Sequence, residues 1–167
     1  MIKQAAIALC VGVLTSIHPS AFAVQEKHIF EVSVDIPTLG FYVIPSEAGW
    51  IHREQTLPWN IHTSTLGGLR KHFDVKTDSS AIEARLESFP YLSSGGDSRD
   101  NIVLRVSFNG RELGHDPTPR QVVSVEEAMA GSRVLLEIEP REQAGGYKPG
   151  EYYGTVNIVF NVAAPAG

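Results

Sequence analysis

The sequence has one cysteine in 167 residues, Cys10, and it lies in the N-terminal apolar stretch. One cysteine forms neither an intramolecular disulfide nor a multi-cysteine metal site, so neither can support this fold. An excess of basic residues is also missing, because 14 Lys and Arg stand against 19 Asp and Glu, for a formal net charge of −5. Nucleic acids and anionic membranes attract a basic face, so neither is expected as a partner.

A long hydrophobic run is missing as well. The apolar stretch at residues 5–14 follows Lys3 and is shorter than the ~20 residues that a membrane-spanning helix needs. Ala21-Phe22-Ala23 then supplies small residues at the positions that a signal peptidase reads. The segment predicts a secretory signal over residues 1–23, cleaved after Ala23. Cleavage also removes Cys10, so disulfides cannot stabilise the exported chain in an oxidising compartment.

Apolar and polar residues alternate in most of the remaining sequence, which predicts β-strands. The pattern occurs at residues 73–77 and 102–108, and Asn109-Gly110 then supplies the pair favoured in tight hairpin turns. Residues 81–86 have some helix propensity, but the neighbouring segments favour a strand, and another strand is predicted at 134–139.

The C-terminal segment at residues 151–162 is predicted to be the longest alternating strand. One of its faces would carry Tyr152, Gly154, Val156, Ile158 and Phe160. Many short strands separated by turns, with one helix at residues 125–130, predict an all-β sandwich.

No pattern points to catalysis, a metal or a cofactor. His28, His52, His62, His72 and His115 form no closely spaced pair of metal ligands. Glu83 with Glu87, and Glu126 with Glu127, are interpreted as solvated side chains rather than acid–base pairs. The sequence has no nucleophile elbow and no phosphate-binding glycine loop. We therefore expect no enzymatic activity.

The first strand after the signal is unusual for its position. Residues 30–36 place Phe30, Val32, Val34 and Ile36 on one face, and Pro37 ends the run. Chain termini are commonly frayed, yet this one carries an uninterrupted apolar face. It is either an ordinary first strand of the sandwich or a strand that completes another molecule's sheet by β-strand addition.

Four segments, in order, resemble the CS1-type (CFA/I-like) major fimbrial subunits. They are the start of the exported chain, an early strand and turn, a central hairpin, and a C-terminal G-x-Y-x-G-x-V strand, at residues 24–37, 73–78, 104–113 and 149–159. The chain differs from this family by an extra residue between Lys27 and Asp35, which bears on the register of the donor face. Spore-coat-type pilins fit less well, because they usually carry cysteines and an Asp where Gly154 stands.

The resemblance implies an immunoglobulin-like sandwich that lacks one strand, with residues 38–167 as the pilin domain. Residues 24–37 would be a donor strand, with Phe30, Val32, Val34 and Ile36 filling the groove of the next copy in a surface fimbria. It also implies a periplasmic chaperone, an outer-membrane usher, and in some cases a tip adhesin and a host receptor as partners. The alternative is a secreted monomeric adhesin or carbohydrate-binding domain that uses Trp50 or Trp59.

Overall fold

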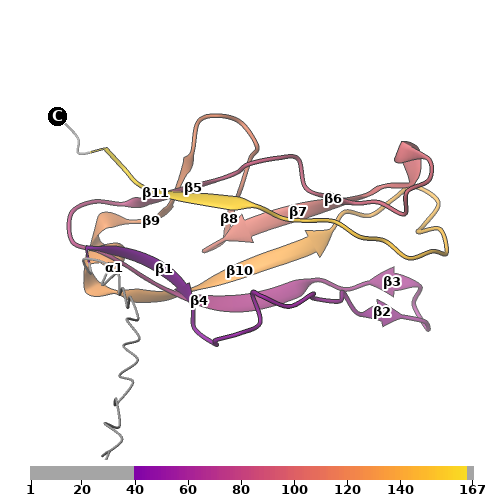
Figure 1. The fold of residues 1–167 in the computed structure, drawn as a ribbon, viewed down its shortest axis with the longest axis horizontal. Helices are drawn as coiled ribbons and strands as arrows, with labels where there is room; N and C mark the ends of the chain where they lie inside the picture. The colour runs from indigo at the N-terminus through magenta and orange to yellow at the C-terminus, as the bar shows by residue number, and fades with distance from the viewer. Residues whose placement is uncertain (1–39, 165–167) are drawn as a thin grey trace, which may run out of the picture. The chain divides into compact units, whose positions relative to one another are not determined.

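The structure is a computed structural model that describes residues 40–164. The predicted signal peptide, Pro37 and the predicted donor residues Phe30, Val32, Val34 and Ile36 lie outside the described residues. The described chain is built from antiparallel β-strands and carries one short α-helix and one 3-10 turn, η1 (Ser98–Asp100) (Figure 1). The predicted all-β sandwich is therefore confirmed.

The larger sheet has six strands, all paired antiparallel. Strand β7 shows why the sequence forms it, because Ile102, Leu104, Val106 and Phe108 are buried while Arg105 between them is exposed. Across the sheet the order is β1 (Phe41–Pro45), β4 (Leu69–Thr77), β10 (Ser132–Pro140), β7 (Ile102–Phe108) and β6 (Tyr91–Leu92), with β8 (Arg111–Glu112) also paired to β7.

The smaller sheet has the order β11 (Ile158–Val162), β5 (Ile82–Leu86) and β9 (Arg120–Val123). The middle strand, β5, buries Ile82, Ala84 and Leu86, which confirms the strand predicted for residues 81–86. A separate hairpin pairs β2 (Trp59–Asn60) with β3 (Thr65–Leu66). Within residues 40–164, these three sets contain all the strand pairing apart from one isolated bridge, and Figure 1 shows how the strands are arranged.

Two local signals in the sequence form as predicted. Asn109 and Gly110 have φ values of 50° and 71°, so both occupy the left-handed region that a tight hairpin turn between β7 and β8 requires. Helix α1 (Val125–Ala130) begins with a capping box, in which the Ser124 hydroxyl accepts from the Glu127 N–H while the Glu127 carboxylate accepts from the Ser124 N–H.

The prediction of one long C-terminal strand is wrong in extent. Strand β11 begins at Ile158, so Tyr152, Gly154 and Val156 precede it, and the nine-residue strands β4 and β10 are longer. The neighbouring strand β5 ends at Leu86, and residues 152–156 are paired only by the isolated bridge between Tyr153 and Ser93, which is not a continuous ladder. Alternation along a chain describes which side chains share a face, but a strand also needs a partner backbone.

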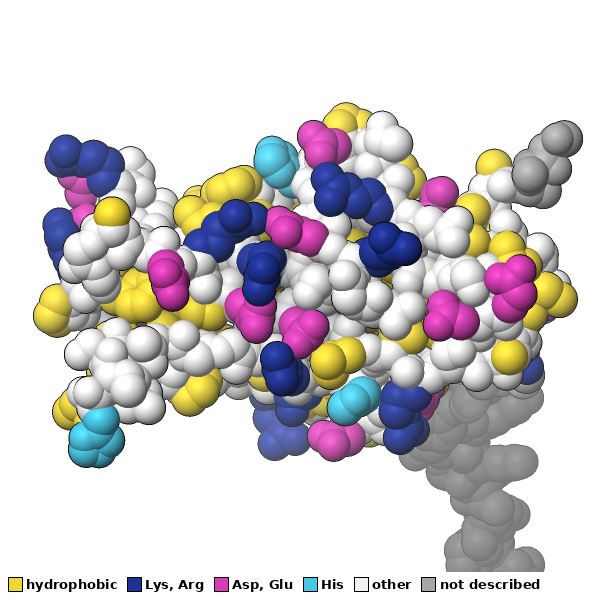
Figure 2. Space-filling view, turned by 180° about the vertical axis from the view of Figure 1, so that it is seen from behind, with side chains coloured by type: hydrophobic (Ala, Val, Ile, Leu, Met, Phe, Trp, Pro, Cys, Tyr) yellow, Lys and Arg dark blue, Asp and Glu magenta, His cyan; other side chains and the backbone are white. Residues whose placement is uncertain are grey.

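The hydrophobic core lies between the two sheets. Phe108 from β7 contacts Phe73 from β4 and Phe160 from β11, with ring centroids 5.7 and 4.8 Å apart. The outer face of the larger sheet is charged instead, with ion pairs Arg133–Asp74 and Arg70–Glu137 across neighbouring strands. Figure 2 shows positive and negative side chains interleaved over the middle of this face, as expected for a solvent-exposed surface.

Candidate functional site

The core is closed on the β5 side of the smaller sheet and open on the β11 side. Ile82 and Ala84 of β5 are fully buried, whereas Ile158 and Phe160 of β11 are only partly buried although they pack against the same core. Ile138 of β10, across the core, is also partly buried. Apolar side chains from both sheets therefore face a space that the described chain does not fill.

That space is a groove with a volume of about 1000 Å³. Its floor comes from the inner faces of β4, β7 and β10, and its lining is mainly apolar. One wall is formed by β11 and the residues before it, and the other by the loop between β1 and β2. The lining includes Trp50, Leu57, Leu69, Phe73, Ile102, Leu104, Leu136, Ile138, Tyr152, Gly154, Val156, Ile158 and Phe160.

Trp50 anchors the wall that comes from the loop between β1 and β2. Its ring meets Phe73 edge to face with centroids 5.8 Å apart, and the Lys71 ammonium lies 5.3 Å from the indole centroid. The Gln55 side-chain amide donates to the Trp50 carbonyl oxygen at 3.1 Å, which folds the loop back on itself. The indole Nε1 is buried with no acceptor among the described residues. Trp50 therefore packs on the core and also lines the groove.

The opposite wall is attached through Tyr153 to Ser93, the residue that follows β6. Tyr153 and Ser93 exchange two backbone hydrogen bonds, of 2.8 and 2.9 Å. A Cβ atom at Gly154 would lie 2.2 Å from the Tyr91 carbonyl oxygen, so only glycine allows this approach. The predicted face of Tyr152, Gly154, Val156, Ile158 and Phe160 thus lines the groove, although only its last two members are in a strand.

The edge of β11 that faces away from β5 has no partner strand among the described residues. Asn157 accepts from the Glu87 N–H at 3.0 Å, and the Ala163 N–H donates to Ala81 at 2.9 Å. Bonded and non-bonded positions alternate along an antiparallel strand, so residues 159 and 161 also face β5. The backbone groups of Ile158, Phe160 and Val162 consequently point toward the open edge.

The mouth of the groove is more polar than its floor. The negative charge of Glu151 raises the pKa of the Tyr153 hydroxyl, with smaller contributions from burial and from Glu54 on the opposite wall. The Lys148 ammonium donates to Asp100 at 2.9 Å, and this bond raises the lysine pKa. An apolar floor with a charged mouth suits an occupant whose side chains alternate between apolar and polar.

Other residues singled out in the sequence lie away from the groove floor. Trp59 is 49% exposed and meets Tyr147 edge to face with centroids 6.1 Å apart. His115 lies against the exposed Phe89 ring. Within residues 40–164, no three histidine, cysteine or acidic side chains gather closely enough to hold a metal ion. No helix in that part of the chain is long and apolar enough to cross a bilayer.

Sequence reasoning missed the loop wall and much of the floor. Leu57, Gln55 and Leu69 lie in a stretch with no regular period, and the strand predicted at residues 134–139 did not indicate that Leu136 and Ile138 line a groove. A signal was present in the short apolar pieces Trp50-Ile51 and Leu57-Pro58-Trp59, which flank a polar stretch. Such residues indicate a loop that turns one face toward a hydrophobic surface.

Comparison with known proteins assigns this architecture. The family model described as CS1 type fimbrial major subunit matches residues 25–161. Among solved structures, the CooA pilin subunit from enterotoxigenic Escherichia coli matches with a TM-score of 0.50 and 19% identity, over 63% of this chain and 75% of that one. The comparison with curated proteins gives no significant match.

Both matches are to pilin subunits, which does not favour a free-standing carbohydrate-binding domain. The family match spans most of the sequence and includes the whole groove-bearing sandwich except its last residues. The chain therefore belongs to the CS1-type fimbrial major subunit family and is a structural pilin subunit of a surface fimbria.

Proposed function

We propose that this pilin polymerises by donor-strand exchange through the groove between its sheets. Residues 24–37 of one copy would lie as an extended strand in the groove of the next copy, with residues 38–167 forming the body of each subunit. Phe30, Val32, Val34 and Ile36 would point at the groove floor. The observation that carries the proposal is the open apolar groove beside the unpaired edge of β11.

The lengths of the groove and the donor agree. The alternating groove residues from Tyr152 to Phe160 span roughly 26 Å at the usual rise of about 3.3 Å per residue. The donor face from Phe30 to Ile36 spans roughly 20 Å by the same rise. The groove is therefore long enough for all four donor side chains, and it is longer than the donor face by about two residues.

Two contributions to the free energy favour a donor strand bound in the groove. Burying four apolar side chains would contribute roughly 6–12 kcal/mol gross, at about 1.5–3 kcal/mol each. The donor backbone would also pair with the groups of Ile158, Phe160 and Val162 that point toward the open edge. An unoccupied groove leaves both the apolar floor and this edge exposed, which is the condition that promotes aggregation.

Each subunit would donate one strand and accept one, through different surfaces. Such a heterologous contact does not close on itself, so repetition produces a filament rather than a ring. This is how a structural subunit of a fimbria can be both the building block and the connector.

The same proposal covers the route to the surface. Residues 1–23 would direct export into the periplasm and be removed there. An exposed groove would then need a temporary partner, so a periplasmic chaperone would occupy it until an outer-membrane usher adds the subunit to the fibre. A tip adhesin and a host-surface receptor would act at the assembled fimbria.

The test compares three variants expressed with the signal segment intact. One lacks residues 24–36, a second carries that segment again after Gly167, and a third carries the appended segment with Val32→Asp and Val34→Asp. We expect only the second to accumulate as a folded monomer without a chaperone, because it fills its own groove. A truncated first variant that folds unaided as a stable monomer would sink the proposal.

A further inference from the structure

Exposed apolar side chains lie at both ends of the sandwich, outside the groove floor. At one end the β2–β3 hairpin exposes Trp59 and Ile61, which are 49% and 76% exposed. At the other, α1 exposes Val125 and Met129, which are 37% and 52% exposed. Figure 2 shows hydrophobic side chains at both extremities, separated by the charged middle of the sheet. We refer to the two pairs as the hairpin tip and the α1 face.

The hairpin tip is held in a fixed conformation. The Asn60 side-chain oxygen accepts from the N–H groups of His62 and Thr63, at 3.0 and 3.3 Å, and so closes the turn that carries Ile61. The Gly67 N–H donates to the Pro58 carbonyl at 2.8 Å and closes the base of the hairpin. The exposure of Ile61 is therefore built into the turn.

The α1 face is fixed in a similar way. Ala128 is fully buried and anchors the helix to the core, which turns Val125 and Met129 outward. These two residues are four positions apart, so they are neighbours on one side of the helix. The helix lies against the C-terminal end of β4, where Phe41 at the start of β1 pairs with Thr77.

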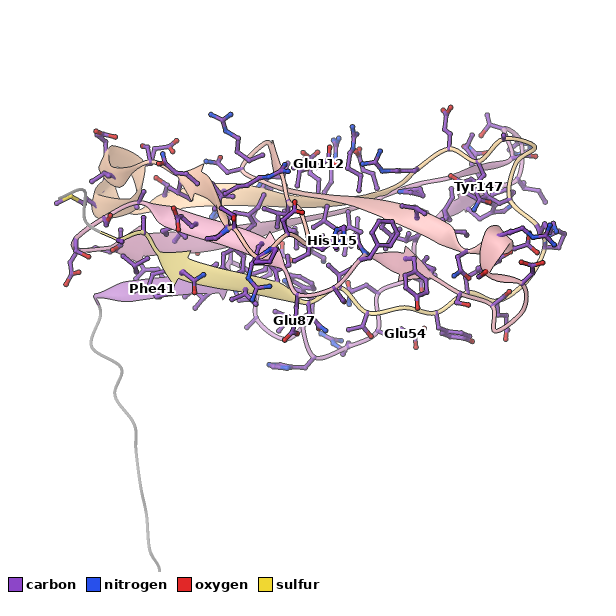
Figure 3. The ribbon with its side chains drawn as sticks, turned by 90° about the horizontal axis from the view of Figure 1, so that it is seen from above. Phe41, Glu54, Glu87, Glu112, His115 and Tyr147 are labelled. Atoms are coloured by element: carbon purple, nitrogen blue, oxygen red, sulfur yellow. The ribbon has the colours of Figure 1, made fainter. Side chains whose placement is uncertain are left out.

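The described chain begins at the α1 end, because Gly40 directly precedes Phe41 at the start of β1. Figure 3 shows Phe41 at one end of the fold and Tyr147, which contacts Trp59, at the other. The groove reaches the hairpin end, since Trp59, Leu66 and Tyr147 are among its lining residues. Suppose that the donor left the groove of the accepting subunit at that subunit's α1 end. The α1 end would then lie beside the subunit that donates to it and also beside the subunit that receives its own donor. A donor that leaves at the hairpin end gives each subunit one neighbour at each end.

The connection between donor and body is short. Only four residue steps separate Ile36 from Gly40, where the described body begins, so this connection spans at most about 14 Å. With Ile36 seated near the hairpin end of one groove, the α1 end of the donating subunit must lie close to that hairpin. Two exposed apolar surfaces are thereby brought together.

We propose that the α1 face of each subunit packs against the hairpin tip of the subunit whose groove it fills, as a second contact between neighbouring bodies in the fibre. The partner is a second copy of this chain, and the inference rests on the proposed donor-strand exchange. The contact would bury Trp59, Ile61, Val125 and Met129 together, and would restrict the angle between successive subunits.

The absence of cysteine after the predicted cleavage site allows a direct test. Fimbriae are assembled from a chain carrying both Ile61→Cys and Met129→Cys, oxidised, heated in detergent and separated without reductant. We expect a ladder of covalent oligomers longer than dimers, which collapses to monomer with reductant. The matched control combines Met129→Cys with Ile44→Cys, because Ile44 is 51% exposed but lies on β1. It should give no ladder beyond dimers.

The outcomes separate this contact from donor-strand exchange. Fibres that assemble but yield no more covalent oligomer than the control overturn the body contact and leave the exchange intact. If the thiol pair prevents assembly, the pair Trp59→Cys and Val125→Cys decides by the same measurement. The proposal of donor-strand exchange is tested by a different experiment, and it fails if the chain that lacks residues 24–36 folds on its own.

Discussion

Phe108 and Phe160 meet edge to face with ring centroids 4.8 Å apart, and they join the two sheets at the inner end of the groove. Phe108 is fully buried, whereas Phe160 is only partly buried because its other side lines the groove. The same aromatic contact therefore belongs both to the folded core and to the surface that a neighbouring subunit would cover. Stability of the subunit and stability of the fibre are coupled through this residue.

Replacing Phe160 by alanine should weaken the fibre strongly. In an occupied groove the ring is enclosed, so its loss should approach the about 3–5 kcal/mol that a buried Phe→Ala change costs. The measurement is the temperature at which purified fimbriae dissociate in detergent. The control is Phe89→Ala, since Phe89 is 48% exposed and contacts His115 outside the groove. Equal decreases in the dissociation temperature for the two variants would contradict the expectation that the donor strand covers Phe160.

A charge placed on the groove wall should block assembly, and the same charge one residue away should not. Val156 lines the groove, whereas Asn157 is exposed and bonds to Glu87 through its backbone carbonyl. Val156→Asp would bury an unpaired carboxylate beneath the donor strand, which is strongly unfavourable. We expect few or no surface fimbriae by electron microscopy for Val156→Asp and normal numbers for Asn157→Asp. Comparable fibre counts would show that the groove stays open to water.

Gly154 should not tolerate even a methyl group. Its Cβ would sit 2.2 Å from the Tyr91 carbonyl oxygen, so the strand pair at Ser93 and Tyr153 would have to separate. Overpacking of this kind costs about 1–3 kcal/mol. Gly96→Ala is the matched control, because a Cβ there meets only the Ser94 hydroxyl at 3.6 Å. Dissociation temperatures of the two fimbriae should differ, with Gly154→Ala the lower.

The sequence predicted well those elements whose signals are local. The period-two pattern of β7, the turn at Asn109-Gly110 and the helix at residues 125–130 all depend on neighbouring residues, and all three form. The strand predicted for residues 151–162 is shorter than expected because residues 152–156 pair with another backbone only at the isolated bridge between Tyr153 and Ser93, and a strand needs a continuous ladder. Sequence alternation specified the face of that segment but carried no information on its partner.

The sequence indicates that a receiving groove exists, but it does not indicate which residues line that groove. The alternating pattern of residues 30–36 predicts an apolar strand that needs a surface to receive it. The wall formed by Trp50 and Leu57 comes from an irregular loop whose path is set by contacts with Phe73 and by the Gln55 hydrogen bond. Long-range contacts of this kind have no periodic signature in a sequence.

Acid should weaken the larger sheet through one cross-strand ion pair. Arg133 donates to both carboxylate oxygens of Asp74, at 2.8 and 3.2 Å, and this bonding holds the pKa of Asp74 below its ordinary value of 3.8. A carboxyl whose pKa is lower in the folded state stabilises that state at pH values above its ordinary, unfolded pKa. The stabilisation disappears as the pH falls through the lower, folded value.

Asp74→Asn should therefore lower the dissociation temperature of fimbriae at pH 6 and have little effect once the pH is below the lowered pKa of the folded carboxyl, where the wild-type group is itself protonated. Dissociation measured from pH 6 downward should show the wild-type and variant curves converging on the acidic side. Asp116→Asn, in an exposed loop, serves as the control and should follow the wild-type curve throughout. A constant difference between wild type and Asp74→Asn at every pH would mean that side-chain shape, and not the carboxylate charge, accounts for the effect, because only the charge depends on protonation.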